Sequence, residues 1–184
     1  WDRIVDERTS NLARKSQRPL IFDSRMAWHF VPNSFKIRLI ANHLVAANRI
    51  FTRRSVTEED YRSIDHAVDL TRQRATSESK RYRQYYGVDL MDPSNYDLII
   101  DTSYLTSAEV LLLTLSALGS PRGDTILFLH PKQIYASPEA SQPHLFPIRV
   151  EPDGQSFVAH TSGHVIEHAQ RSDAPILRAT LWNG

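Results

Sequence analysis

The sequence alternates short apolar segments with helical segments, and this alternation constrains the fold more than any other feature. Residues 96–101 (Tyr-Asp-Leu-Ile-Ile-Asp) are apolar enough for a strand buried on both faces, as in the centre of a parallel sheet. Thr106 follows, with Glu109 three residues later, and this spacing predicts a capping box at the start of a helix that ends near Leu118. Strands that alternate with helices predict an α/β protein with a parallel sheet and covering helices.

Other segments extend this pattern in both directions. The remaining expected strands are short runs that are apolar throughout or at every second position, at 20–22, 35–40, 125–130, 156–161 and 176–181. The remaining expected helices are polar or amphipathic stretches, at 2–15, 43–54, 57–86 with Thr57 as N-cap, and 163–171.

A turn cluster at residues 119–123 (Gly-Ser-Pro-Arg-Gly) predicts a domain boundary. Three of the ten prolines precede residue 120 and seven follow it, so the composition of the chain changes at the same place. We therefore expect a first domain over 1–119 and a small α+β domain over 124–184. A unit of about 60 residues buries too little surface to be stable alone, so we expect it to pack against the first domain.

The composition excludes several classes of protein. The 184 residues include no cysteine, which excludes a disulfide scaffold, a thiolate nucleophile and a cysteine-bound zinc or iron–sulfur site. No apolar run reaches the roughly 18–20 residues of a membrane span, so we expect no membrane partner and a cytoplasmic location. The sequence begins with Trp1, and no signal peptide follows it. We expect the chain to be a processed or excised piece of a longer one.

The charges are distributed unevenly along the chain. Residues 1–83 carry 17 basic and 10 acidic side chains, whereas residues 84–184 carry 5 and 11. A basic half favours an anionic partner, either a nucleotide phosphate or a nucleic acid, and of the two we favour the nucleotide. Solvated helix faces explain the same pattern without any partner.

Three charged residues of the long helix form a row. Arg74, Glu78 and Arg81 are spaced i, i+4 and i+7, so they lie on one helical face. Two guanidinium groups can bind a phosphate or a base edge, and the carboxylate between them can accept from a sugar hydroxyl. The alternative is an exposed helix with salt bridges along its surface.

The histidines near the end of the chain match a metal-binding pattern. His164, Glu167 and His168 fit H-x-x-E-H, and His160 precedes them by four residues. Zinc peptidase chemistry needs a further ligand from a later helix, and little chain follows. An amphipathic helix with its apolar side buried explains the segment better, and we assign no metal site.

Aromatic and acidic residues beside the predicted strands allow two interpretations each. Tyr82, Tyr85 and Tyr86 can stack on bases, but their spacing is also typical of helix packing, which we favour. Asp97 and Asp101 flank a strand end where open α/β sheets gather ligands, or they cap turns.

Several of these motifs together resemble the cytidylate kinase family, in the short form common in archaea and some bacteria. The resemblance rests on Glu78–Asp89, on residues 96–110, and on Asp23–Arg25 (Asp-Ser-Arg), which is similar to the family's Asp-Gly-Arg. It extends over about residues 2–118.

The resemblance implies a fold, an activity and a set of site residues. The fold would be a P-loop nucleoside-monophosphate-kinase-like parallel sheet, and the activity would be phosphoryl transfer from ATP to CMP or dCMP with Mg²⁺. The residues implied to bind the acceptor nucleotide are Asp23, Arg25, Arg74, Glu78 and Arg81. The residues implied to form the lid over the transferred phosphate, and hence to act in catalysis, are Arg49, Arg53 and Arg54.

Three departures from the family pattern bear on activity. The sequence contains no G-x-x-x-x-G-K-[ST] loop to cradle phosphates. Ser24 replaces the usual glycine, and Ala46 replaces an arginine of the lid. A loop upstream of Trp1 would explain the first departure, and so would loss of activity. The second hypothesis for function is therefore a catalytically degenerate nucleotide-binding protein that acts as a regulatory or scaffold subunit.

The C-terminal residues resemble a second family. This family is that of the ParB/sulfiredoxin-like domains, which bind phosphate at a helix start. The similarity lies in residues 130–135, Pro147–Val150, Ser162–Ala169 and 175–181. In this sequence Gly163 and His164 match, but an apolar residue replaces the family's arginine. The resemblance implies a small docking or structural module.

Overall fold

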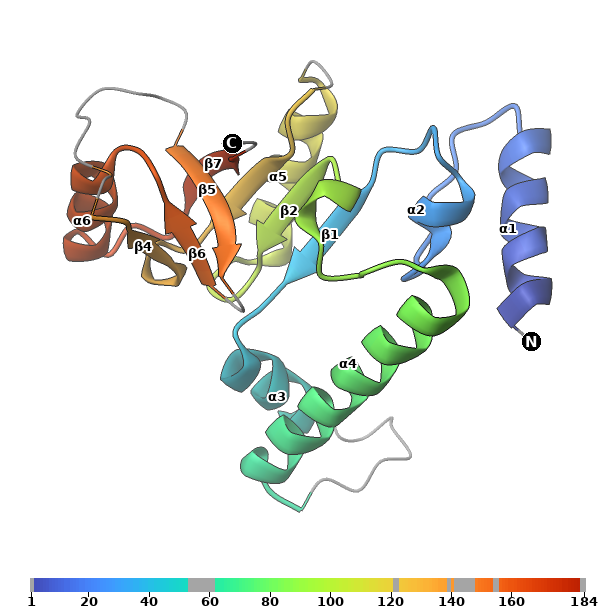
Figure 1. The fold of residues 1–184 in the computed structure, drawn as a ribbon, viewed down its shortest axis with the longest axis horizontal. Helices are drawn as coiled ribbons and strands as arrows, with labels where there is room; N and C mark the ends of the chain where they lie inside the picture. The colour runs from blue at the N-terminus through green and yellow to red at the C-terminus, as the bar shows by residue number, and fades with distance from the viewer. Residues whose placement is uncertain are drawn as a thin grey trace.

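The computed structural model describes residues 2–52, 62–120, 123–138, 140, 148–153 and 156–182 (Figure 1). These residues form one seven-stranded sheet in the order β1-β2-β3-β7-β5-β6-β4, with helices around it. The strands are β1 (Ile37–Ile40), β2 (Leu98–Asp101), β3 (Ile126–Leu129), β4 (Ile134–Ala136), β5 (Ile148–Asp153), β6 (Ser156–Ala159) and β7 (Leu177–Leu181). The helices are α1 (Asp2–Lys15), α2 (Ala27–Phe30), α3 (His43–Thr52), α4 (Ile64–Tyr86), α5 (Ser107–Leu118) and α6 (Gly163–Arg171), with short 3₁₀ turns η1 (Pro93–Asn95) and η2 (Pro131–Gln133).

Strands β1 and β2 are parallel, as predicted, and β3, which we assigned to the second domain, continues the same parallel sheet. Leu39 in β1 lies opposite Ile100 in β2, and Ile100 lies opposite Phe128 in β3. All four residues of β2 are buried, because α5 covers one face of the sheet through Ala117 and the C-terminal strands cover the other. The capping box predicted for α5 is present, with the Thr106 and Glu109 side chains each bonded to the other's backbone.

The sheet continues beyond the parallel strands and curls back on itself. β7 pairs antiparallel with β3, and β5, β6 and β4 follow it. β4 begins only five positions after β3 ends, yet three strands separate the two in the sheet. The sheet must therefore bend, which places Ile134, Phe157 and Ile166 against Ile99 and Leu127 in one apolar cluster.

The boundary predicted at residues 119–123 lies between two paired strands. β2 precedes it and β3 follows it, and the two pair in parallel from Leu98 and Ile126 onward. The two predicted domains thus share a sheet, and the division at 119 and 124 remains a prediction about the organisation of the chain.

The long helix α4 is capped at both ends. Ser63 accepts a hydrogen bond from the His66 N–H at its start, and Gly87 at its end has a φ of 68°, which glycine adopts without strain. The predicted start at Thr57 and the end of the helix predicted over 43–54 lie outside the described residues. α3 packs on α4 through Ala47 and Ala67, both fully buried (Figure 1).

The strand predicted at residues 20–22 is wrong. These residues have no regular structure, and Ile21 is 99% exposed. A strand needs a partner for its backbone groups, and within the described ranges β1 pairs with β2 alone. The structure also contains one α-helix and two strands that we did not predict, α2, β4 and β5. None of the described helices has the length and apolar character needed to cross a membrane.

Candidate functional site

Arg25 and Glu78, which the family resemblance assigns to one site, meet in the structure. The Arg25 guanidinium forms an ion pair with the Glu78 carboxylate, and the Arg74 Nε lies 3.4 Å from the same Oε1 atom. The Glu78 side chain is only 20% exposed, while those of Arg25 and Arg74 are 53% and 60% exposed. Two cations therefore converge on one partly buried carboxylate and present their outer faces to solvent.

Local hydrogen bonds hold the loop that carries Arg25. The Ser24 Oγ accepts from the backbone N–H groups of Met26 and Ala27, each at 3.2 Å, and so caps the turn into α2. The Trp28 Nε1 donates to the Arg25 carbonyl at 2.8 Å. Ser24, which replaces the glycine of the family motif, thus stabilises this loop in the conformation that brings Arg25 to α4.

The remaining predicted acceptor residues, Arg81 and Asp23, have other surroundings. Arg81 donates to the Tyr82 Oη at 3.2 Å and lines a hollow of about 830 Å³ between α4 and α1. Asp23 is exposed in the loop before Arg25. The structure thus joins three of the five predicted acceptor residues by direct contacts. It places Arg81 beside α1.

Arg49 binds backbone oxygen atoms at the end of β2. Its guanidinium donates to the Thr102 carbonyl at 2.6 Å, to the Thr102 Oγ1 at 3.1 Å and to the Ser103 carbonyl at 3.3 Å. These bonds join α3 to the loop after β2, and this structural role was not predicted. The other lid residues that we predicted, Arg53 and Arg54, lie outside the described residues.

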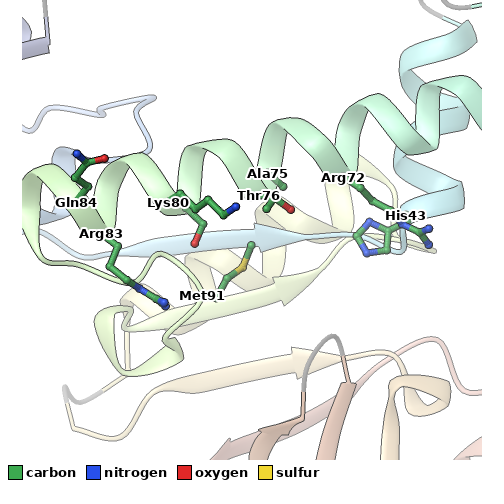
Figure 2. Close-up of a pocket in the computed structure, with 9 residues that line it drawn as sticks. His43, Arg72, Ala75, Thr76, Lys80, Arg83, Gln84 and Met91 are labelled. Carbon is green, nitrogen blue, oxygen red and sulfur yellow. The ribbon is translucent and has the colours of Figure 1, made fainter.

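The opposite face of α4 carries a basic hollow that sequence analysis missed. A hollow of about 670 Å³ is lined by Arg72, Lys80 and Arg83 from α4, by His43 from α3 and by Met91 (Figure 2). Figure 2 shows Arg72 and His43 at one end and Arg83 at the other, with Lys80 between them. The periodic spacing of these cations along the helix was a signal that could have revealed the hollow.

An acidic residue neutralises one end of this hollow. Arg83 forms an ion pair with Asp89, whose pKa is lowered by a hydrogen bond from the Met91 N–H, by Arg83 itself and by the charge of Arg38. Asp89 therefore stays ionised and holds the Arg83 guanidinium against the loop that follows α4. Arg72 and Lys80 supply the positive charge along the rest of the hollow.

The two aspartates that flank β2 fix loops. The Asp97 Oδ2 accepts from the Lys36 N–H at 2.7 Å. Asp101 is 1% exposed and accepts from the Ser103 hydroxyl at 2.6 Å and from the His130 N–H at 3.3 Å. Asp101 thus connects the end of β2 to the end of β3.

The tyrosines of α4 pack against other helices. Tyr82 is buried, and the Tyr86 hydroxyl donates to Asp6 of α1 at 2.8 Å while its ring lies 5.6 Å from that of Phe30. Tyr85, in contrast, is 70% exposed. The packing interpretation is thus confirmed for Tyr82 and Tyr86.

The histidine pattern near the C-terminus does not assemble a metal site. In the part of the chain that the structure describes, no group of three or more His, Asp or Glu side chains can hold a metal ion. His160 instead stacks on Trp182 with the ring centroids 5.1 Å apart, and its Nε2 lies 3.1 Å from Glu151.

Comparison with known proteins agrees with the resemblance found in the sequence. A model of the cytidylate kinase-like family matches residues 1–104, more than half of the chain. The chain belongs to the cytidylate kinase-like family. The cytidylate kinases of Methanothrix thermoacetophila and Methanosarcina acetivorans are each 34% identical to it, over 64% and 65% of this chain. An S-adenosylmethionine-dependent nucleotide dehydratase of Lacinutrix mariniflava is also 34% identical, over 59% of this chain and 21% of its own length.

The match to these relatives is partial. The chain spans 63% of the Methanothrix protein and 67% of the Methanosarcina protein. No solved structure matches the chain. The C-terminal strands β3 to β7 follow the residues that the family model covers.

Proposed function

We propose that this chain binds a cytidine monophosphate, CMP or dCMP, through the cluster formed by Arg25, Arg74 and Glu78, with Arg81 about one helical turn farther along α4. The observation that carries the proposal is the convergence of two arginines, from separate segments, on one partly buried carboxylate. A bound phosphate can accept from the two guanidinium groups, because each carries five N–H donors and is more than half exposed. The Glu78 carboxylate keeps both guanidiniums oriented before any ligand arrives.

In this proposal the chain supplies the acceptor half of a phosphoryl transfer from ATP. Such transfers depend on positioned cations and exclusion of water rather than on covalent work by side chains. ATP and Mg²⁺ would require a phosphate-binding loop, which this sequence does not contain. The edge of β1 that has no strand beside it in the described ranges is where a further parallel strand can add to the sheet. The alternative function, a regulatory or scaffold protein that binds nucleotide without catalysis, is favoured by Ala46, which replaces an arginine of the lid.

The experiment is a calorimetric titration with CMP of three proteins, the wild type, Arg74→Ala and Arg81→Ala. Loss of a charge-assisted phosphate contact should weaken CMP binding by about tenfold or more. Arg18→Ala is the matched control, because Arg18 is an exposed arginine outside the cluster. Equal CMP affinity in all four proteins, with unchanged melting temperatures, would overturn the assignment.

A further inference from the structure

The row of charged residues on α4 continues into an exposed aromatic side chain. Arg74, Glu78 and Arg81 lie on one face of the helix, and Tyr85 follows Arg81 on the same face, one further turn along. Tyr85 is 70% exposed, so helix packing, which explains the two neighbouring tyrosines, does not explain this one. The seven positions from Glu78 to Tyr85 correspond to about 10 Å along the helix axis. A nucleoside monophosphate spans about this distance from its phosphate to its base.

The hollow between α4 and α1 lies at the aromatic end of this row. Arg81 and Tyr85 line it from α4, Asp6 lines it from α1, and Phe30 of α2 adds a second ring. Its volume of about 830 Å³ exceeds the roughly 300 Å³ at which small-molecule sites begin. A nucleotide whose phosphate lies at the proposed acceptor site can therefore place its base in this hollow.

Asp6 is held in this hollow by a neutral donor. The Tyr86 hydroxyl donates to the Asp6 Oδ2 at 2.8 Å, and the Tyr86 ring lies 5.6 Å from that of Phe30. Among the described residues, the Asp6 Oδ1 has no hydrogen-bond partner and Asp6 forms no ion pair. Glu7, the other carboxylate in the lining, instead pairs with Arg3 at 3.4 Å. Asp6 thus offers a positioned oxygen that accepts hydrogen bonds and donates none.

We propose that this hollow holds the base of the nucleotide, and that Asp6 makes the site prefer cytosine to uracil. Its carboxylate accepts a hydrogen bond from the 4-amino group of cytosine, and Tyr85 stacks on the base. Uracil carries a carbonyl oxygen at the same position, so two acceptors would face each other without a proton between them. The inference rests on the proposed function, because it assigns the base end of the same nucleotide.

The test measures binding of CMP, UMP and ribose 5-phosphate to the whole chain by calorimetry. Asp6→Asn keeps an oxygen that accepts from the Tyr86 hydroxyl but adds an N–H donor, so the preference for CMP over UMP should fall by about tenfold. Tyr85→Ala should weaken CMP and UMP alike, by about tenfold. Neither substitution should change the binding of ribose 5-phosphate, which has no base. The matched controls are Asp69→Asn and Tyr135→Ala, at exposed positions outside the hollow, and they should change none of the three affinities.

Two results would overturn this inference and leave the proposed function in place. One is CMP binding that is lost in Arg74→Ala but keeps its preference over UMP in Asp6→Asn and its affinity in Tyr85→Ala. The other is equal binding of CMP and UMP by wild type, with both affinities dependent on Arg74. Because Tyr85 is exposed, its variant tests the site even where Asp6→Asn loosens the contact with Tyr86.

A third result would overturn both proposals together. It is the absence of binding of CMP and of ribose 5-phosphate, at millimolar concentration, by a wild-type chain with a sharp melting transition. Ribose 5-phosphate therefore reports the phosphate end of the site separately from the base end, and failure of one proposal is distinguishable from failure of the other.

Discussion

Arg25, in the loop before α2, forms an ion pair with Glu78 in the middle of α4. Arg74 joins the pair one helical turn before Glu78, at 3.4 Å. The loop is fixed by Ser24 and Trp28 on its own side, so the ion pair connects two segments that are each ordered independently. A binding site assembled in this way needs little reorganisation when an anion arrives.

The coupling between Arg25 and Glu78 should be measurable in the free protein. We expect a double-mutant cycle with Arg25→Ala and Glu78→Ala to give a coupling free energy of about 0.5–1 kcal/mol, since one partner is exposed and the other partly buried. The measurement is urea unfolding of the four proteins. The exposed pair Arg3–Glu7 is the control, with an expected coupling of about 0.3–0.5 kcal/mol. Additive effects of the two substitutions would show that the contact does not form in solution.

Arg49 should contribute to stability apart from any role in the lid. Its three hydrogen bonds connect α3 to the loop after β2, and Arg49→Ala removes all of them. We expect the free energy of unfolding to fall by about 1–2 kcal/mol, measured by urea unfolding. Arg18→Ala should change it by less than about 0.5 kcal/mol. If Arg49→Ala had the same free energy of unfolding as wild type, the hydrogen bonds of Arg49 to the Thr102 and Ser103 carbonyls would not contribute to stability.

Gly163, at the start of α6, is predicted to tolerate no side chain. A Cβ there would lie 3.2 Å from the Ala136 Cβ and 3.2 Å from the Ala140 carbonyl oxygen, and the second of these is backbone that cannot rotate away. Gly163→Ala should therefore lower the free energy of unfolding by about 1–3 kcal/mol. Gly123→Ala is the matched control because no atom of the described residues lies within 4 Å of its Cβ position. Equal melting temperatures for the two variants would contradict the close packing of α6 on β4.

The pH dependence of stability should report His130. This residue is 7% exposed, accepts from the Lys132 N–H at 3.2 Å and lies 4.4 Å from the Tyr104 ring. Burial lowers the pKa of His130 below its ordinary value. The unfolded chain therefore binds the proton first, and stability is lost as the pH falls below about 6.5 toward the folded pKa.

We expect His130→Asn to reduce this loss, because asparagine can still accept from the Lys132 N–H but does not titrate. The free energies of unfolding of wild type and variant should be compared by urea titration at about pH 7.5 and about pH 5.5, on either side of the ordinary histidine pKa. Parallel pH profiles would mean that His130 is not held neutral in the fold.

Much of the fold was predictable because the decisive signals were local. The capping box at Thr106, the apolar run of β2 and the amphipathic segment of α6 each specify their element without reference to the rest of the chain. The prediction of a strand at residues 20–22 was wrong for the opposite reason. Its apolar residues fit a strand, but a strand also needs a neighbour, and pairing partners are not encoded in the segment itself.

The candidate site was predictable only in part. The helical spacing that relates Arg74 to Glu78 is visible in the sequence, and the resemblance to a kinase family added Arg25, which no periodicity connects to α4. The backbone contacts of Arg49 depend on how α3 lies against the loop after β2. No local pattern in the sequence reports that arrangement.

Binding of a cytidine monophosphate by the cluster of Arg25, Arg74 and Glu78 is tested most directly by calorimetric titration of this chain with CMP, dCMP, UMP and ATP separately. We predict binding of CMP or dCMP at least about tenfold tighter than UMP, and loss of that binding in Arg74→Ala. We expect no ATP binding by this chain, because its sequence contains no phosphate-cradling loop. No binding of either cytidine nucleotide by the folded chain would contradict the proposal and leave the kinase-like fold without its proposed ligand.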